Sequence, residues 1–349
     1  MTIQELFRLK QKSNNKVYII AELSANHNHN FETAVKSIKA AKQCGVDAIK
    51  LQTYTADTIT IDVRNKYFQI DQGTIWDGKN LHDLYKEAFT PWEWQPKLKS
   101  IAEQEGLECF SSPFDLTSVD FLEKMDVSAY KVASFEITDI PLIEYIASKQ
   151  KPVIISTGIA TLGDIELAVN TCRKVGNNEI SLLKCTSSYP APIEEANLLT
   201  IPHLRDTFNV IPGLSDHTMG QSVAIAAVAL GARIIEKHFI LDRSIGGPDS
   251  SFSMEPQEFK KMVEAIRDVE KALGIVTYEL TPKVEKSKSF ARSLFIVKDV
   301  KAGDEITLDN VRSIRPGYGL HPKYYLGIIG KKFRKDCEKG TPLNWSLFE

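Results

Sequence analysis

The run IIEKHF at residues 234–239 is mostly apolar and contains a histidine two residues after a glutamate. The run GLSDH at residues 213–217 likewise ends in a histidine that follows an acidic residue. Side chains alternate between the two faces of an extended strand. Glu236 and His238 therefore share one face, and the serine and histidine of the earlier run share a face of theirs. Two neighbouring strands of this kind would direct two imidazoles and a carboxylate at a common point. That ligand set indicates a divalent metal ion held by His217 and His238.

Similar short apolar runs recur along the chain and alternate with segments of helical spacing. Strands that alternate with helices pair in parallel, and strands covered on both faces are almost continuously apolar. Eight strands in about 270 residues match the size of a (β/α)8 TIM barrel. A doubly wound open sheet is the competing architecture, and the lack of a Gly-x-Gly-x-x-Gly turn after the first strand counts against it. The predicted strands are residues 17–23, 48–52, 107–111, 129–133, 153–156, 181–185, 210–214 and 233–239, and the predicted helices are residues 31–44, 91–105, 116–125, 140–148, 162–174, 221–230 and 256–273.

The last part of the chain differs in composition from the rest. We expect residues 1–273 to form the barrel and the polar, lysine-rich residues 274–289 to form a linker. Residues 290–349 would then form a small C-terminal domain, which buries little surface alone and would dock on the barrel or on a partner subunit. Within it we expect short strands at residues 290–297, 305–308 and 311–314.

Bulk composition excludes several classes of partner. The formal net charge of −2 favours neither nucleic acid nor an anionic membrane as a partner. The longest apolar stretch, residues 223–230, is far too short to span a bilayer. The five cysteines are odd in number and widely spaced, with no Cys-x-x-Cys, so we expect reduced side chains in a cytoplasmic protein.

Polar residues gather at the carboxyl ends of the predicted strands, where barrel enzymes carry their chemistry. Lysine is rarely buried without a partner, so Lys50, Lys131 and Lys184 at three such ends indicate a strongly anionic ligand. Hydroxyl groups are natural partners for phosphate or carboxylate oxygens. The hydroxyl groups near these strand ends belong to Ser111, Ser134, Ser156 and Thr186.

Two further features carry open alternatives. Glu22 and Glu136 are candidate general acid–base groups, because a pocket can shift the pKa of each carboxyl, although Glu22 could instead pair with Lys50. The long connection from residue 53 to residue 90 contains Trp76 and is either an apolar lid over a sugar or simple packing on the barrel rim.

In combination, the motifs of this chain resemble those of the sialic acid synthase family over its full length. The C-terminal region resembles the antifreeze-like SAF domain of that family. The resemblance implies condensation of phosphoenolpyruvate with an N-acetylated amino sugar. It is carried by AELSANH at 21–27, KLQT at 50–53, FSSPF at 110–114, YKVASFE at 130–136, STG at 156–158, KCTSSYP at 184–190, the two histidine runs, and RP at 315–316.

Within that family, the sequences of several motifs are similar to those of the pseudaminic branch. The motifs ELSANH at 22–27, QTYT at 52–55, FARSL at 290–294 and RPGYGLHP at 315–322 support this branch. The resemblance then implies 2,4-diacetamido-2,4,6-trideoxy-L-altrose as the sugar. A legionaminic or N-acetylneuraminic acid synthase is the alternative within the family.

The resemblance also implies residue roles. A Mn²⁺-like ion, with Mg²⁺ or Co²⁺ as alternatives, would sit on the two histidines, with Glu236 as a partner of the ion through water. Glu136 would transfer a proton or orient water, and Glu22 would hold sugar hydroxyls or steer the group bound to the metal. Arg315 would enter the active site of a partner subunit, which implies a domain-swapped homodimer. Phosphoenolpyruvate would be held by Lys50, Ser111, Lys131, Ser134, Ser156, Lys184, Thr186 and Ser215, and the sugar by Tyr189, Asp249 and Arg315.

Two functions of other classes compete with a metal-dependent synthase. A Schiff-base aldolase would use Lys131 or Lys184, because barrel aldolases also place lysine at strand ends. A non-catalytic sugar or phosphate receptor would keep the barrel and lose polar positions, and none of the positions named above is missing.

Overall fold

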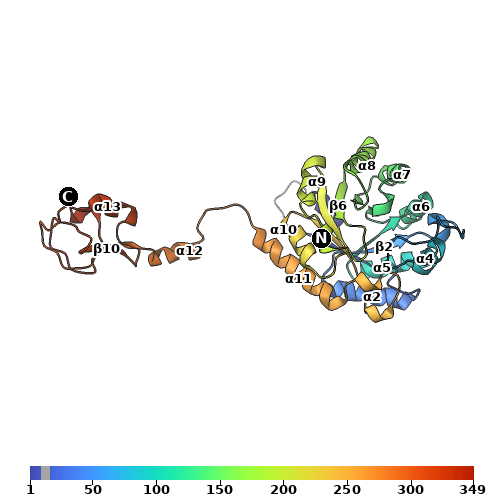
Figure 1. The fold of residues 1–349 in the computed structure, drawn as a ribbon, viewed down its shortest axis with the longest axis horizontal. Helices are drawn as coiled ribbons and strands as arrows, with labels where there is room; N and C mark the ends of the chain where they lie inside the picture. Colours follow the sequence, from blue (N-terminus) through green and yellow to red (C-terminus); the bar gives the residue numbers. More distant parts are fainter. Residues whose placement is uncertain (9–15) are drawn as a thin grey trace. The chain divides into compact units, whose positions relative to one another are not determined.

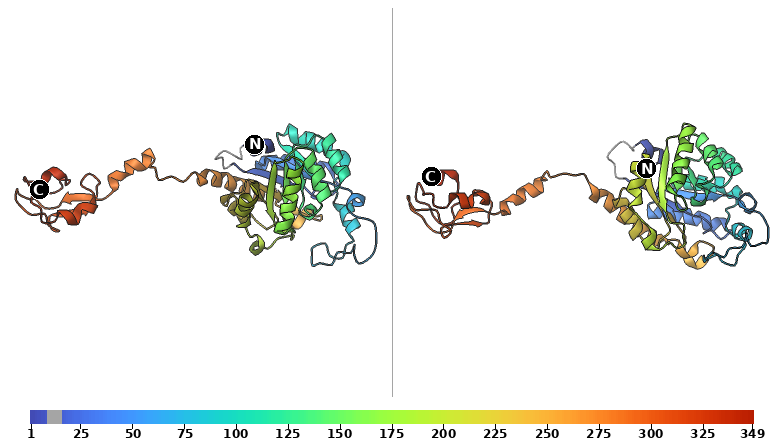
Figure 2. Two further views of the ribbon diagram at one scale, coloured as in Figure 1. Left: turned by 90° about the horizontal axis from the view of Figure 1, so that it is seen from above. Right: turned by 45° about the horizontal axis from the view of Figure 1, so that its top comes forward.

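The computed structural model describes residues 1–8 and 16–349. It divides into two compact units, Met1–Gly274 and Ile275–Glu349, and each is described by itself. The first unit is a closed barrel of eight parallel strands in the order β1 to β8, surrounded by helices (Figure 1, Figure 2). The predicted (β/α)8 barrel is confirmed, and the closed sheet rules out the doubly wound alternative.

The strands are short and buried, and most begin and end within two residues of the predicted limits. They are β1 (Tyr18–Glu22), β2 (Ala48–Thr53), β3 (Glu108–Pro113), β4 (Tyr130–Val132), β5 (Val153–Ser156), β6 (Ile180–Cys185), β7 (Ile211–Asp216) and β8 (Ile234–His238). The helices of this unit are α1 (Ile3–Arg8), α2 (Phe31–Cys44), α3 (Ala56–Ile59), α4 (Leu81–Ala88), α5 (Gln95–Gln104), α6 (Leu116–Lys124), α7 (Ile140–Ser148), α8 (Leu162–Lys174), α9 (Thr200–Phe208), α10 (Ser222–Ala229) and α11 (Pro256–Leu273).

Strand pairing decides which side chains face the lumen. Glu22 of β1 pairs with Lys50 of β2, and Ser215 of β7 pairs with Glu236 of β8. Residues paired in register point to the same side of a parallel sheet, and the side alternates along each strand. Followed around the barrel, this alternation brings the following side chains to the lumen near the carboxyl ends: Glu22, Lys50, Gln52, Ser112, Lys131, Ser156, Cys185, Ser215, Glu236 and His238.

Local sequence explains the helices that surround the barrel. In α2 the buried residues Ala34, Ile38 and Ala41 recur at helical spacing and pack in the layer between helices and strands. The Asn30 side chain accepts a hydrogen bond from the Thr33 amide at the start of α2, which stabilises a helix by about 1 kcal/mol. Such signals predicted α2, α7, α8 and α11 with correct limits.

Four helices of the barrel unit were not predicted. Helix α1 precedes β1, helices α3 and α4 lie within the long connection after β2, and α9 lies after β6. Helix α3 has only 4 residues, too few to show a period. Between α3 and α4 the connection is an extended loop at one side of the barrel (Figure 2).

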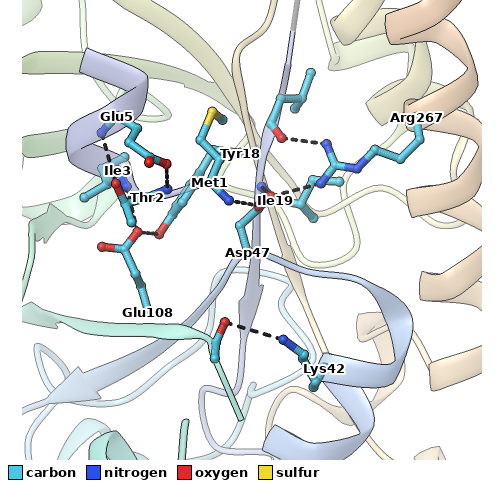
Figure 3. A network of polar contacts seen from close by, with 12 residues as sticks. Met1, Thr2, Ile3, Glu5, Tyr18, Ile19, Lys42, Asp47, Glu108 and Arg267 are labelled. Atoms are coloured by element: carbon cyan, nitrogen blue, oxygen red, sulfur yellow. Dashed lines mark hydrogen bonds and ion pairs between the residues drawn. The ribbon is translucent and has the colours of Figure 1, made fainter. Parts of the chain in front are cut away.

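The amino-terminal end of the strands is closed by a polar network (Figure 3). Asp47 lies 3.0 Å from the guanidinium of Arg267 and 3.1 Å from the Met1 amino group. Glu108 accepts hydrogen bonds from the Tyr18 hydroxyl and the Ile3 amide, each at 2.6 Å. A cavity of about 540 Å³ adjoins these groups. Both carboxylates are bonded within the protein, so this end stabilises the barrel.

The second unit has its own small core. Strands β9 (Ser293–Ile296) and β10 (Val311–Ile314) form an antiparallel pair, and α13 (Tyr325–Ile328) follows. The prediction of a strand at 305–308 was wrong, because only Glu305 forms a bridge, to Lys332. Within the expected linker, Pro282–Ser287 forms α12. Among the described helices of both units, none is long and apolar enough to cross a membrane.

Candidate active site

Two lysines and two glutamates meet in the lumen at the carboxyl end of the barrel. Lys50 Nζ contacts a carboxylate oxygen of Glu22 and lies 3.0 Å from Glu236 Oε1. Lys131 Nζ lies 3.6 Å from the same Glu236 oxygen, and its side chain is 2 % exposed. The register described above places these four side chains on one face. They form a compact charged cluster that is closed to bulk water.

Burial dominates the electrostatics of this cluster. Burial lowers the pKa of Lys131, and Glu236 only partly counters it. Burial also works against the charged form of Lys50, but the carboxylates of Glu22 and Glu236 outweigh it and raise the pKa of Lys50. The pKa of Glu22 is raised by burial, against the pull of Lys50. The two lysines are therefore paired with two glutamates in formal charge, and an anionic ligand would replace these carboxylates as partners of the ammonium groups.

A row of hydroxyl groups lies beside Lys131. Lys131 Nζ donates to Ser156 Oγ at 2.7 Å, and Ser134 Oγ lies 2.7 Å from Ser187 Oγ. The Ile159 amide donates to Ser134 Oγ at 3.2 Å. A Cβ at Gly158 would lie 2.0 Å from Ser187 Oγ and 2.5 Å from Ser134 Oγ, so a larger residue there would displace both hydroxyls. Ser187 belongs to a motif quoted above but was missing from the predicted site.

The prediction for Ser111 needs correction, because its hydroxyl faces the helices and not the lumen. Ser111 Oγ lies 2.6 Å from Thr53 Oγ1, which donates to Gln95 of α5. The next residue, Ser112, lies in the lumen with its hydroxyl 3.4 Å from Lys50 Nζ. The strand was predicted correctly, but the serine that faces the lumen is Ser112 and not the predicted Ser111.

Lys184 needs the same correction, and the Thr186 hydroxyl is bonded to groups outside the charged cluster. Lys184 Nζ donates to the Cys185 carbonyl at 2.7 Å and to Thr186 Oγ1 at 3.3 Å, and Thr186 donates to Glu195 O. Because Cys185 pairs in register with Ser215, it is Cys185 that faces the lumen and Lys184 that faces away. The lumen therefore contains Lys50 and Lys131, but not Lys184.

Glu22 has a neighbour that the predicted site omitted. Gln52 Nε2 donates to Glu22 Oε1 at 2.9 Å. Gln52 lies two residues after Lys50 on β2, so strand alternation places both in the lumen. That spacing was a usable sequence signal.

His217 and His238 lie side by side, with ring centroids 5.3 Å apart. His217 Nδ1 lies 3.0 Å from the Thr186 carbonyl, so this nitrogen carries the proton and leaves Nε2 as the basic nitrogen. His238 is buried, and its Nδ1 has no hydrogen-bond partner among the described residues. Burial and the positive neighbours lower the pKa of His238 well below its ordinary value, which keeps the ring neutral.

These two imidazoles fit a divalent metal ion, with one restriction. The Glu236 Oε2 oxygen nearby is also buried without a partner among the described residues. Within residues 1–8 and 16–349 no group of three or more His, Cys, Asp or Glu side chains has metal-binding geometry. The protein would thus supply two nitrogen ligands, and the remaining positions would fall to water or substrate oxygens.

An aromatic wall covers the histidines. The Tyr189 ring lies 4.4 Å from His217, and Phe252 lies 4.9 Å from His238. Trp76, from the long connection after β2, lies 5.4 Å from Tyr189 and donates from Nε1 to Pro248 O at 2.9 Å. Trp76 therefore brings the long connection against the aromatic wall beside the histidines.

Other aromatic residues in or near this connection do not join this wall. Tyr67 is 77 % exposed. Trp92 donates to the Tyr54 carbonyl and stacks on Phe121, which is packing on the barrel rim.

Two carboxyl groups border the wall and the cluster. Asp249 accepts a hydrogen bond from Ser24 Oγ and lies 3.9 Å from His238 Nδ1, and burial raises its pKa. Glu136 follows β4, and its Oε2 has no hydrogen-bond partner among the described residues. Burial raises the pKa of Glu136 to about 7, although Lys131 acts in the opposite direction. Glu136 can therefore exchange a proton near neutral pH.

Arg315 belongs to the second unit, which is described separately from the barrel. Its side chain is exposed and forms no ion pair with any residue in the described ranges. The side chains of the barrel site described above all belong to the first unit.

A (β/α)8 barrel with lysines, hydroxyls and an imidazole pair at its carboxyl end defines a class of enzymes that act on anionic substrates. The family model described as the NeuB family matches residues 37–278, and the SAF domain model matches residues 291–349. The chain belongs to the NeuB family.

Individual relatives extend over almost the whole chain. The pseudaminic acid synthase of Campylobacter jejuni is 48% identical over 334 residues, which are 96% of this chain and 97% of that protein. The N,N'-diacetyllegionaminic acid synthase of Legionella pneumophila is 36% identical over 339 residues, 95% of this chain and 94% of that protein. A solved structure, the N-acetylneuraminic acid synthetase of Leptospira borgpetersenii in complex with citrate, has a TM-score of 0.70 and 32% identity, covering 78% of this chain and 90% of that one.

Proposed function

We propose that the chain condenses phosphoenolpyruvate with 2,4-diacetamido-2,4,6-trideoxy-L-altrose and water, giving pseudaminic acid and phosphate. The reaction class is supported by the buried lysines beside the imidazole pair in one lumen. The branch is supported by the 48% identity to the Campylobacter enzyme over 334 residues, against 36% for the legionaminic acid synthase.

Phosphoenolpyruvate carries a carboxylate and a phosphate, and the site offers separate partners for each. Lys50 and Ser112 would bind the carboxylate. Lys131 would bind the phosphate, together with the hydroxyls of Ser134, Ser156, Ser187 and Ser215. Each serine can donate one hydrogen bond to an anionic oxygen, and such charge-assisted bonds are stronger than neutral ones.

His217 and His238 would hold the divalent ion, with Mn²⁺ as the proposed metal and Mg²⁺ or Co²⁺ as alternatives. When bound, the ion supplies Lewis acidity toward the aldehyde oxygen of the open-chain sugar. His217 is oriented for this role by its bond to the Thr186 carbonyl. Glu236, which accepts from Ser215 at 3.2 Å, would reach the ion through water.

The sugar would lie against the aromatic wall. Tyr189 offers a ring face to acetamido methyl groups, and Asp249 offers a carboxylate to hydroxyl or amide groups. Glu22, held by Gln52, would accept hydrogen bonds from sugar hydroxyls. In the condensation, C3 of phosphoenolpyruvate bonds to the aldehyde carbon, which leaves cationic character at C2.

Water then adds at C2, and the C2–O bond to phosphate breaks. Glu136 would accept the proton of this water, because its carboxylate has one oxygen free among the described residues and a pKa raised to about 7 by burial. A base with a pKa near the working pH is efficient in both directions of proton transfer.

We further propose a domain-swapped homodimer in which Arg315 enters the site of the other subunit. Residues 275–281 are without regular structure, and they precede the short helix α12, so the connection is long enough to reach a neighbour. The five cysteines are buried and unpaired, which supports a cytoplasmic location.

Phosphate release tests the function. The protein is mixed with phosphoenolpyruvate and either the diacetamido sugar, its legionaminic counterpart or N-acetylmannosamine, with and without a chelator. We expect release to require a sugar, to be fastest with 2,4-diacetamido-2,4,6-trideoxy-L-altrose, and to stop with the chelator. Preference for N-acetylmannosamine would overturn the branch, and release without any sugar would overturn the reaction.

A further inference from the structure

A second buried ion pair lies behind the histidines, on the helix-facing side of β7 and β8. Lys237 Nζ lies 2.7 Å from Asp216 Oδ2, and each side chain is 1% exposed. The two residues are partners in strand register. They alternate with the side chains that face the lumen, so neither charge can touch a substrate there. The proposed chemistry uses neither charge.

This pair organises the turn after β7. Asp216 Oδ1 accepts hydrogen bonds from the Thr218 amide at 2.9 Å and from the Thr218 hydroxyl at 2.8 Å. Lys237 Nζ donates to the Thr218 carbonyl at 2.5 Å. His217 is the residue between Asp216 and Thr218, so its backbone is held on both sides. Lys237 in turn directly precedes His238.

A gain in the stability of the fold does not by itself explain a buried ion pair of this kind. Taking two charges out of water costs more than most ion pairs return, and well-packed apolar residues are often as stable. What the pair does supply is a fixed relation between the ends of two strands. We propose that Asp216 and Lys237 are positioning residues, which hold the imidazoles of His217 and His238 at the spacing that binds a divalent cation.

The two histidines depend on the pair to different degrees. His217 has an additional anchor, the Thr186 carbonyl, at 3.0 Å. His238 Nδ1 has no hydrogen-bond partner among the described residues, and Asp249 lies 3.9 Å from it, beyond hydrogen-bond distance. The direction of the ring is therefore set by the backbone, by packing against Phe252 and by this weak contact. Loss of the pair should therefore displace His238 more than His217.

Binding of Mn²⁺ alone, measured by isothermal titration without substrates, tests the inference. The double variant Asp216→Asn with Lys237→Met removes both charges and keeps an oxygen for Thr218. We expect its melting temperature to stay within about 5 °C of the native protein. We expect its Mn²⁺ dissociation constant to rise about 10- to 100-fold, the usual effect of losing groups that orient metal ligands. Native Mn²⁺ affinity in the folded double variant would overturn the inference.

A matched control separates stability from positioning. Arg267→Met breaks the ion pair with Asp47 at the other end of the strands, and should lower the melting temperature while leaving Mn²⁺ affinity unchanged. If the double variant does not fold, Thr218→Val serves instead, since it removes only the hydroxyl bonded to Asp216. A severalfold weaker Mn²⁺ affinity in this variant supports the inference, and native affinity overturns it.

The inference rests on the proposed metal site, and the two can fail separately. Absence of Mn²⁺ binding to the native protein would refute the metal site itself. In that case a crystal structure of the double variant still tests the positioning role, because unchanged His217 and His238 rings would overturn it and a displaced His238 ring would support it.

Discussion

Ser111 and Ser112 are neighbours in the chain, yet their hydroxyls lie on opposite sides of β3. Ser111 is bonded to Thr53 between the strands and α5, and Ser112 lies 3.4 Å from Lys50 Nζ in the lumen. The same alternation separates Lys184 from Cys185 on β6. The pairing of strands thus decides which member of each adjacent pair belongs to the site.

Replacing these two serines one at a time should give different kinetics. Ser112→Ala removes a hydroxyl from the proposed binding site of the phosphoenolpyruvate carboxylate. A hydrogen bond to a charged group contributes about 1.5–3 kcal/mol. We expect KM for phosphoenolpyruvate to rise about tenfold or more in steady-state assays. Ser111→Ala is the matched control, which should keep KM and lose about 1 kcal/mol of unfolding free energy. Equal effects of both changes on KM would contradict the assignment.

Glu136 should set the acidic limb of the pH–rate profile. As a base it acts when deprotonated, so activity should fall as pH drops through the pKa of about 7. Glu136→Gln should flatten this limb and lower kcat by about 10²- to 10⁴-fold. The exposed Glu166→Gln on α8 is the control, and it should keep the native profile. An unaltered acidic limb in Glu136→Gln would exclude this carboxyl as the base.

The same carboxyl should weaken the fold at high pH. Its pKa is raised from 4.5 to about 7 on folding, so the folded state binds more protons and stability falls as pH rises between these values. Well above pH 7 the ionised, buried group costs at most about 3.4 kcal/mol. Glu136→Gln should therefore melt at a higher temperature than the native protein at pH 8, and at a similar temperature at pH 4.5. Calorimetry at both pH values measures this difference.

The chemical state of Lys131 during turnover distinguishes the proposed synthase from a Schiff-base aldolase. Its lowered pKa would suit an imine, but its ammonium is bonded to Ser156 and lies near Glu236. Lys184 points away from the lumen. We expect no covalent adduct by mass spectrometry after borohydride treatment with pyruvate, and full loss of activity with a chelator that added Mn²⁺ restores. A borohydride adduct on Lys131 would favour the aldolase.

Composite sites can be tested by mixing two inactive variants. His217→Ala damages a site through the barrel, and Arg315→Ala damages it through the second unit. In a swapped dimer, half of a statistical mixture is mixed, and each mixed dimer has one intact site, so about a quarter of native activity should return. Activity measured after unfolding and refolding the variants together gives the answer. A mixture as inactive as its components would mean that Arg315 acts within its own subunit or not at all.

Trp76 should affect the sugar and not phosphoenolpyruvate. It covers Tyr189, and losing an apolar contact of this kind costs about 1–3 kcal/mol in discrimination. Trp76→Ala should raise KM for the diacetamido sugar about tenfold and leave KM for phosphoenolpyruvate unchanged. Ile75→Ala, the 48% exposed neighbour in the same loop, should change neither constant.

Sequence periodicity was sufficient for most of the barrel and for part of its site. Continuous apolar runs such as Val153–Ser156 identify buried strands, and helical spacing identified Phe31–Cys44 with both ends correct. Short elements were missed because a 4-residue helix such as α3 shows no period. In the second unit, apolar residues at 305–308 resembled a strand but support only one bridge.

Which residues at the strand ends point into the lumen could not be predicted from one strand alone, because it depends on the pairing with neighbouring strands. Lys50 and Gln52 share a face by alternation alone, so Gln52 was within reach of sequence reasoning. The facing of Lys184 depends on the pairing of Cys185 with Ser215 on the next strand. Ser187 was missed for a related reason, because its contact with Ser134 joins the loops after two different strands.

The lysines of the lumen already have anionic partners before any ligand arrives. Lys50 contacts Glu22 and Glu236, and Lys131 lies near Glu236 as well. An incoming anion must therefore displace carboxylates that the protein itself provides. A chloride or acetate ion would bring only one charge to compete with two tethered glutamates. A molecule with both a carboxylate and a phosphate would offer a charged partner to each lysine, so we expect the glutamates to favour ligands that carry several negative charges.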